Sequence, residues 1–282
     1  MNRKIIAYAI HAIADRVGLS VLGKIIPNAD GDFCEFVPTD GHSNETFVVR
    51  FQLGWRSAQV SFIAGNFAGP LISSMGKCSD EARQSFTAFA NGVAARKIKV
   101  LMQVNGTEID PCQPATWAQD WSFLELSLKL TPIMIEPNDE AQLERFVLEL
   151  VVPMFGMIAT LIGVEENEFQ TMGETEGRSV QTMTTRYERK KVNREACIQL
   201  KGLRCSVCGF DFVENYGRLG IGYVEIHHIK PLASLGTDYR INVSTELEPL
   251  CANCHAMVHR EEPPIAILTL RQIVEERRKK RL

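Results

Sequence analysis

Three stretches decide the fold of this chain: LRCSVCGFDF (203–212), GYVEIHHIKPL (222–232) and LEPLCANCHAMVHR (247–260). They contain four of the eight cysteines and four of the six histidines. The cysteines form two CxxC pairs, Cys205/Cys208 and Cys251/Cys254. Two such pairs supply four thiolates, which is the closed ligand set of a structural zinc site. The alternative is redox chemistry at one pair, which needs a thioredoxin-like βαβ context that the sequence lacks.

The four histidines of these stretches lie where a strand and a helix are expected. His227 and His228 stand in VEIHHI (224–229), which is typical of a strand, so their side chains point to opposite faces. His255 and His259 are four residues apart in a predicted helix and share one face of it. One strand histidine and two helix histidines predict a three-nitrogen metal site with open positions, as catalytic sites have. The alternative is that the histidines are structural.

These motifs carry a family resemblance. EIHHIKPL followed by LCANCHAMVH resembles the HNH endonuclease family, whose core is the ββα-metal fold. The resemblance covers about residues 186–260 and is similar to the cysteine-rich nuclease domains of restriction-type enzymes, including those that act on modified cytosine. It implies that His228 is the general base. It also implies that His227, His255 and His259 hold the metal, as three histidines do in the colicin nucleases.

Two features leave alternatives open. The family commonly has an Asn just ahead of the segment that is LEPLC here, where it braces a loop and orients the base; this chain has Glu246 instead. Asn242, Asn253 or no residue takes that role. Glu225 shares the strand face of His227, so it is either an acceptor for a ligand imidazole N–H or a solvated strand residue.

Basic residues flank the predicted nuclease domain on both sides. They are candidate phosphate contacts, although charge runs near the ends of a domain are often only solvated. Those before the domain are Arg186, Arg189, Lys190 and Lys191, and a second run spans 277–281.

The first half of the chain predicts a separate α+β domain over 1–164 with an antiparallel sheet. Strands are expected over 46–52, 57–65, 97–106 and 122–130, and a helix over 79–95. The apolar run 146–163 is interrupted by Glu149 and Pro153, which favours a core helix over a membrane span. No motif in this half indicates a function. A charged linker over 165–192 would lead to the nuclease domain, 193–282, which opens with a helix capped by Asn193.

Charge and cysteine usage bound the function. The net charge is −3, but residues 1–177 carry 13 basic and 22 acidic side chains, whereas 178–282 carry 18 and 12. Only the second part is suited to a polyanion. The cysteines do not form the framework of a short secreted chain, and the N-terminus lacks a cleavage site, so we expect a reducing cytoplasm.

The sequence as a whole predicts a metal-dependent DNA endonuclease that hydrolyses phosphodiester bonds, of a restriction or defence type, with an N-terminal recognition or regulatory domain. A zinc-stapled module that binds nucleic acid without cleaving it, and a nuclease gated by a ligand- or protein-sensing domain, are the alternatives. The expected cofactors are structural Zn²⁺ and a catalytic divalent cation: Mg²⁺, Mn²⁺, Ni²⁺, Co²⁺ or Zn²⁺. The expected partner is double-stranded DNA. Whether that DNA is modified, and whether the chain forms a homodimer, are left open.

Overall fold

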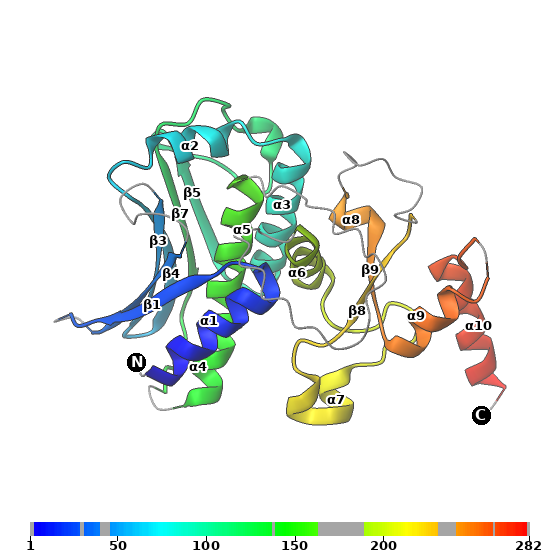
Figure 1. The fold of residues 1–282 in the computed structure, drawn as a ribbon. Coiled ribbons are helices and arrows are strands. Elements are labelled where there is room, and N and C mark those ends of the chain that lie inside the picture. Colours follow the sequence, from blue (N-terminus) through cyan, green and yellow to red (C-terminus); the bar gives the residue numbers. More distant parts are fainter. Residues whose placement is uncertain are drawn as a thin grey trace, which may run out of the picture. The chain divides into compact units, whose positions relative to one another are not determined.

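The computed structural model of the chain describes residues 3–28, 31–39, 46–136, 139–162, 189–230, 241–261 and 263–280. These residues fall into two compact units, Met1–Glu195 and Ala196–Leu282 (Figure 1). Most of the predicted linker, including Glu165–Gly177, lies outside the described residues. The division into 1–164, 165–192 and 193–282 stays a prediction.

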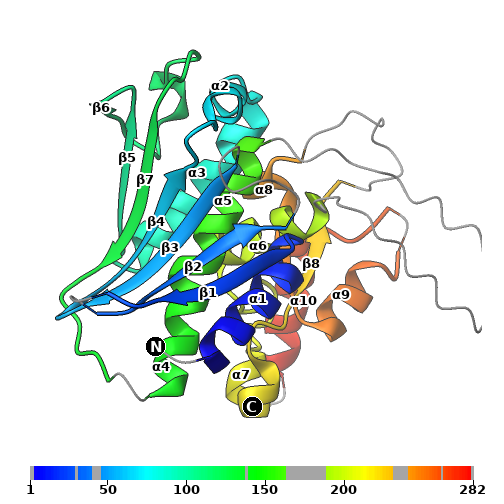
Figure 2. The same cartoon turned by 60° about the vertical axis from the view of Figure 1, so that its left-hand side comes forward.

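The first unit is built on one antiparallel sheet, with helices α1, α3 and α5 on one face (Figure 2). Its described strands follow the order β1-β2-β3-β4-β7-β5-β6. The α+β class and the antiparallel sheet predicted from the sequence are confirmed. The elements are α1 (Arg3–Val17), β1 (Val21–Ile26), β2 (Phe33–Pro38), β3 (Phe47–Gly54), β4 (Ser57–Ala64), α2 (Gly69–Gly76), α3 (Asp80–Ala95), β5 (Lys99–Val104), β6 (Thr107–Glu108), η1 (Pro114–Thr116), β7 (Leu124–Leu130), α4 (Glu140–Phe146), η2 (Val147–Val151) and α5 (Val152–Ile162).

The core lies between the sheet and these helices. Along β3 and β4 the residues alternate between buried and partly exposed, as expected of strands with one covered face. Phe155 of α5 packs against Phe36 and Phe47 of the sheet, with ring centroids 6.5 and 6.2 Å apart. Apolar burial against the sheet therefore holds this unit together.

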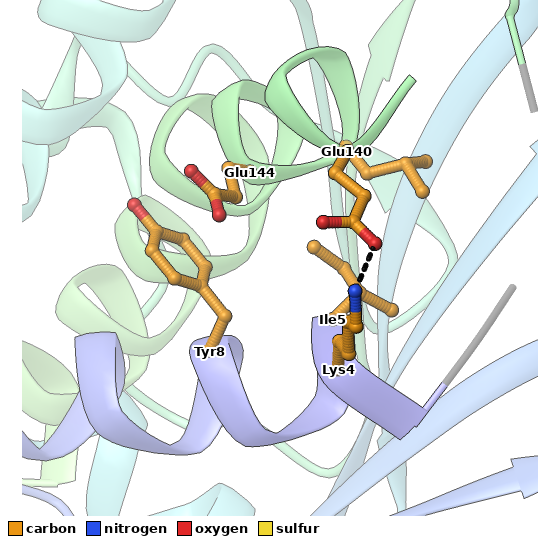
Figure 3. A pocket seen from close by; sticks show the side chains of 6 residues that line it. Lys4, Ile5, Tyr8, Glu140 and Glu144 are labelled. Carbon is orange, nitrogen blue, oxygen red and sulfur yellow. Dashed lines mark hydrogen bonds and ion pairs between the residues drawn. The ribbon is translucent and has the colours of Figure 1, made fainter. Parts of the chain in front are cut away.

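The long apolar run forms the central helix of this unit. From Glu140 to Ile162 it is long and apolar enough to cross a membrane, but 78% of its most apolar window is buried inside the fold. A π-helical turn, η2, joins α4 to α5. Beside it, α1 and α4 border a shallow hollow closed by an exposed ion pair, Lys4 Nζ to Glu140 Oε1, at 2.8 Å (Figure 3).

Helix α6 (Arg189–Lys201) crosses the boundary between the units. It begins four residues before Asn193, so the prediction that Asn193 caps it is wrong, and its first turn occupies the end of the predicted linker. In the first unit Glu195 is fully buried and pairs with Arg16, with Nη1 to Oε2 at 3.5 Å. A buried carboxylate needs such a partner.

The second unit has a ββα arrangement. Strands β8 and β9 pair antiparallel, with His227 opposite Glu248, and α9 follows β9 (Figure 1). A helix beyond the predicted motifs, α10, packs its Leu270 into the core around the cysteines. The elements are α7 (Phe212–Tyr216), η3 (Gly217–Gly220), β8 (Glu225–His228), α8 (Val243–Glu246), β9 (Leu247–Leu250), α9 (Ala252–Val258) and α10 (Ile267–Lys279).

Phe155→Ala tests the core of the first unit. We expect a loss of about 3–5 kcal/mol in the free energy of unfolding, because a buried ring is removed and a cavity remains. Phe67→Ala is the control, since Phe67 is 68% exposed. Denaturant titration of both variants measures the difference, and equal losses would contradict this core.

Candidate metal centre

The four cysteines of the two CxxC pairs come together in the second unit. Their sulfur atoms all lie within 4.8 Å of one another. In the first pair a tight turn closes with Cys205 N–H donating to the Phe210 carbonyl and Gly209 N–H to the Cys205 carbonyl. In the second pair Cys251 is the N-cap of α9, and its sulfur accepts from the Cys254 N–H at 3.5 Å. The fourth cysteine is therefore fixed on the first turn of α9.

The chemistry of these thiols fits a bound zinc ion. Burial raises the pKa of Cys254, and the neighbouring sulfurs raise it further. At Cys205, burial is outweighed by backbone hydrogen bonds at Cys251, Cys208 and Val207, so its pKa is lowered. Four crowded sulfurs cannot all ionise without a compensating cation, and Zn²⁺ takes a tetrahedral set of four thiolates. The cluster thus fits the zinc-stapled domain that the sequence predicts.

Three histidines form a second cluster. The ligand nitrogens of His227, His255 and His259 lie within 4.8 Å of one another. Their ring centroids are 5.0–5.5 Å apart. His227 comes from β8, His255 from α9, and His259 is the C-cap of α9. Because the fourth cysteine immediately precedes His255, the zinc site and the histidine cluster share one helix.

His227 supplies the evidence that this cluster fits a cation. It is 3% exposed, and among the described residues its Nδ1 has no hydrogen-bond partner. A buried ring nitrogen without a partner is costly unless something binds it. Burial lowers the pKa of His227 to about 4, and the neighbouring His259, His255 and His228 rings add to this. The ring is therefore neutral at physiological pH and can act as a metal ligand.

Glu225 contacts one of the candidate ligands. Its Oε2 lies 2.6 Å from Nδ1 of His255. Tyr223 donates its hydroxyl to the other carboxylate oxygen at 3.5 Å. A carboxylate that accepts the Nδ1–H of a ligand histidine fixes the ring and leaves Nε2 for the metal. This contact matches the first of the two interpretations that the sequence left open, and the role of Glu225 stays a prediction.

His228 is adjacent to His227 in β8 but is not one of the three clustered histidines. It is the last residue of β8 and pairs with Leu247 of β9. Because neighbours on a strand point to opposite faces, its side chain faces away from that of His227. This is the arrangement that the strand pattern predicts for one ligand and one separate base.

Glu246 braces the segment that follows His228. Its backbone carbonyl accepts from Ile229 N–H at 2.9 Å. Its carboxylate lies 2.6 Å from Lys230 Nζ and accepts from Asn242 N–H at 3.1 Å. The sequence left open whether Asn242, Asn253 or no residue takes this role and did not indicate Glu246 for it. The position of Glu246 directly ahead of LEPLC was the signal that could have identified it.

The side chains of the two candidate asparagines, Asn242 and Asn253, do not make these bracing contacts. Asn242 caps α8, with its Oδ1 accepting from Ser244 N–H at 3.1 Å. Asn253 is exposed on α9. Through its backbone N–H, Asn242 still joins the bracing contacts of Glu246.

The candidate phosphate contacts are dispersed. Arg186 lies outside the described residues, as do the side chains of Arg189 and Lys190 at the start of α6. Lys191 Nζ donates to the Ala14 carbonyl at 3.5 Å. In the second basic run, Arg278 instead holds the first CxxC turn, donating to the Cys208 carbonyl at 3.0 Å.

Arg271 joins Arg278 in this contact. It donates through both Nε and Nη2 to the Ser206 carbonyl, with Nε at 2.8 Å. Two guanidinium groups of α10 thus lie on the backbone of the turn that carries Cys205 and Cys208. A zinc ion with four thiolates carries a net charge of −2, which these cations would partly offset.

Cys251→Ser tests the zinc site. The variant should lose zinc together with the fold of the second unit, because binding energy at such a site is folding energy. Cys112→Ser, in the first unit, is the control. Metal analysis and circular dichroism check the outcome. Full zinc content in Cys251→Ser, or a folded second unit that never holds zinc, would contradict it.

Replacing the arginines of α10 tests their contacts with the CxxC turn. Arg271→Gln and Arg278→Gln should each release zinc to a chelator about tenfold faster, the lower end of the usual effect of groups around metal ligands. Arg277→Gln, an exposed neighbour on the same helix, should release zinc at the parent rate. Equal rates for all three variants would show that the contacts do not matter.

Comparison with known proteins bears on this unit alone. A search of curated proteins and a search of solved structures gave no match. Residues 205–261 match the model of the HNH endonuclease family. Both clusters, His228, Glu225 and Glu246 lie within the match, whereas the whole first unit and α10 lie outside it. The segment that carries both clusters is thus similar to the HNH endonuclease family over residues 205–261.

Proposed function

We propose that this protein is a metal-dependent DNA endonuclease that hydrolyses phosphodiester bonds. The family match supports nuclease activity in general. The observation that carries the proposal is the three-histidine cluster, with Glu225 set against His255 and His228 on the other face of the same strand. A module that only bound nucleic acid would need no candidate base beside a candidate metal site.

The histidine side chains have two different roles in this proposal, metal binding and proton transfer. His227, His255 and His259 would hold a divalent cation. When bound, such an ion stabilises the negative charge that develops on the phosphate oxygens and the leaving oxygen. His228 accepts a proton from the water that attacks phosphorus. Histidine suits this task because its ordinary pKa is the closest of any side chain to neutral pH.

Other side chains position these groups. Glu225 orients the His255 ring, and Glu246 fixes the backbone at Ile229, the residue after His228. Three imidazole ligands favour Mn²⁺, Ni²⁺, Co²⁺ or Zn²⁺ over Mg²⁺, which prefers oxygen ligands. The catalytic ion should therefore differ from that of carboxylate-based nucleases.

For the whole chain we propose a restriction or defence enzyme whose first unit recognises the target or regulates cleavage. The acidic balance of residues 1–177 favours regulation over direct contact with DNA along most of its surface. None of the eight cysteines, each of them among the described residues, forms a disulfide, which suits a reducing cytoplasm. The target would be double-stranded DNA. Cleavage of DNA with modified bases and assembly of the enzyme into a homodimer are the two points to test first.

His228→Ala tests the base. Cleavage should fall by about 10²–10⁴, the usual effect of losing a general base, while DNA binding and metal content stay close to the parent. A plasmid nicking assay with several cations and an EDTA control measures this. Unchanged cleavage by the variant would refute the role. A parent that binds DNA but cuts none with any cation would favour the binding module.

His255→Ala is the matched comparison. Because this variant removes a candidate ligand and not the base, its activity should partly recover as the metal concentration rises. His228→Ala should not recover under the same titration. If both variants respond alike, the division between ligand and base is wrong.

A further inference from the structure

The second unit has a short segment rich in exposed apolar residues, here called the apolar ridge, just before the strand that carries His227. It spans residues 213–223, from α7 through η3 to the residues just before β8 (Figure 1). Leu219 is 91% exposed and is its most protruding apolar residue. The other members are Val213, Tyr216, Ile221 and Tyr223, between 40% and 59% exposed. Single exposed apolar residues are ordinary, but five within one segment of eleven residues are a feature that needs an explanation.

Aromatic packing supports the segment that forms the ridge. The rings of Phe210, Phe212, Tyr216 and Tyr223 pack on one another, with centroids 4.7–6.2 Å apart. Asp211 caps α7 by accepting from Val213 N–H at 2.8 Å. These contacts fix the start of the segment. The packed rings and the cap therefore hold α7 and the residues that follow it in place.

Two glycines shape the turn that carries Leu219. Gly217 has φ +58°, a conformation that L side chains rarely adopt. Gly220 lies so close to α7 that a Cβ atom there would be 2.1 Å from the Phe212 carbonyl oxygen. The turn is thus packed down on α7, and Leu219 is held on a rigid support.

The ridge is directly connected to the candidate active site. Its last member, Tyr223, donates to Glu225, which in turn contacts His255. Leu219 is six residues before Glu225, so the two backbones are at most about 20 Å apart, given about 3.3–3.6 Å per residue. Along a duplex that corresponds to about six base steps at about 3.4 Å each.

We propose that Leu219 is a wedge that enters the minor groove of double-stranded DNA and opens a base step near the cleaved phosphate. This rests on the proposed function, because it takes the substrate of that site as the occupant. Proteins that kink DNA insert apolar side chains of this kind between base steps. Arg218, next to Leu219 in the chain, adds a positive charge for the backbone at the point of entry.

The size of the ridge favours DNA over a protein partner. A stable protein interface buries about 800 Å² on each partner and involves about 20–30 residues a side. The ridge is one segment of eleven positions, 213–223, which is too small for that. Opening a base step needs only one or two inserted side chains on a rigid support.

The test uses the full chain carrying His228→Ala, so that bound DNA stays intact. The probe is a duplex that the parent protein cuts, with 2-aminopurine placed in turn at each step within about six positions of the mapped cut. Fluorescence should rise at one or two adjacent steps when the protein binds, because the base loses its stacking. Adding Leu219→Ser should abolish the rise, and Leu219→Met should retain it.

Leu268→Ser is the matched control, since Leu268 is 68% exposed on α10. In proteins with His228 intact, Leu219→Ser should slow cleavage about 10-fold or more, while a mismatch at the opened step should restore most of the rate by lowering the cost of unstacking. Leu268→Ser should cut at the parent rate.

The other outcomes separate this proposal from the proposed function. Suppose that the parent cuts DNA, that 2-aminopurine fluorescence rises at no step, and that Leu219→Ser behaves like Leu268→Ser. The wedge proposal is then wrong, whereas the proposed nuclease function is unaffected. If sedimentation shows a parent dimer that Leu219→Ser dissociates, the ridge joins two copies and the wedge is wrong. If the parent neither binds nor cuts any duplex, both proposals fall.

Discussion

The convergence of four sulfur atoms is the constraint on which the second unit depends. The two CxxC pairs are separated by the residues 209–250, yet their sulfurs lie within 4.8 Å of one another. This brings the turn at Cys205 against the start of α9. His255 then follows on the first turns of that helix and faces His227 across the ββα arrangement. The geometry of the histidine cluster is therefore a consequence of the convergence of the four cysteines.

The two units are stabilised in different ways. The first has a layer of aromatic and aliphatic side chains between a wide sheet and three helices, so apolar burial is sufficient. The second has a two-stranded sheet and a small core around its cysteines. A core that small supplies little stabilisation by itself, and a metal or another cross-link adds to it. Polar contacts also join the turn of the first CxxC pair to β9. Glu248 of β9, for example, accepts from Ser206 Oγ in that turn and from Lys201 Nζ, both at 2.7 Å.

Helix α10 shows that the working unit is larger than the family match. It lies beyond residue 261, but Leu270 belongs to the core around the cysteines, and Arg271 and Arg278 bind the carbonyls of the first CxxC turn. A basic run that the sequence marked for phosphate contacts thus contributes to the metal site through at least one of its members. Guanidinium groups suit this role because one group can donate two hydrogen bonds to a single carbonyl.

The sequence by itself determined the ligand types and part of the elements. Two CxxC pairs predict four sulfurs, a four-residue spacing on a helix predicts one shared face, and alternation on a strand separates His227 from His228, because these patterns follow from local geometry. The same local rules predicted β3, β4, β5 and β7 of the first unit but not β1, β2 or β6. The tertiary structure decided which groups meet across long separations: Glu225 with His255, Glu246 with Lys230 and Asn242, and Arg278 with Cys208. No local period encodes these contacts, since they depend on how the elements pack, and that packing is fixed only when the whole domain has folded.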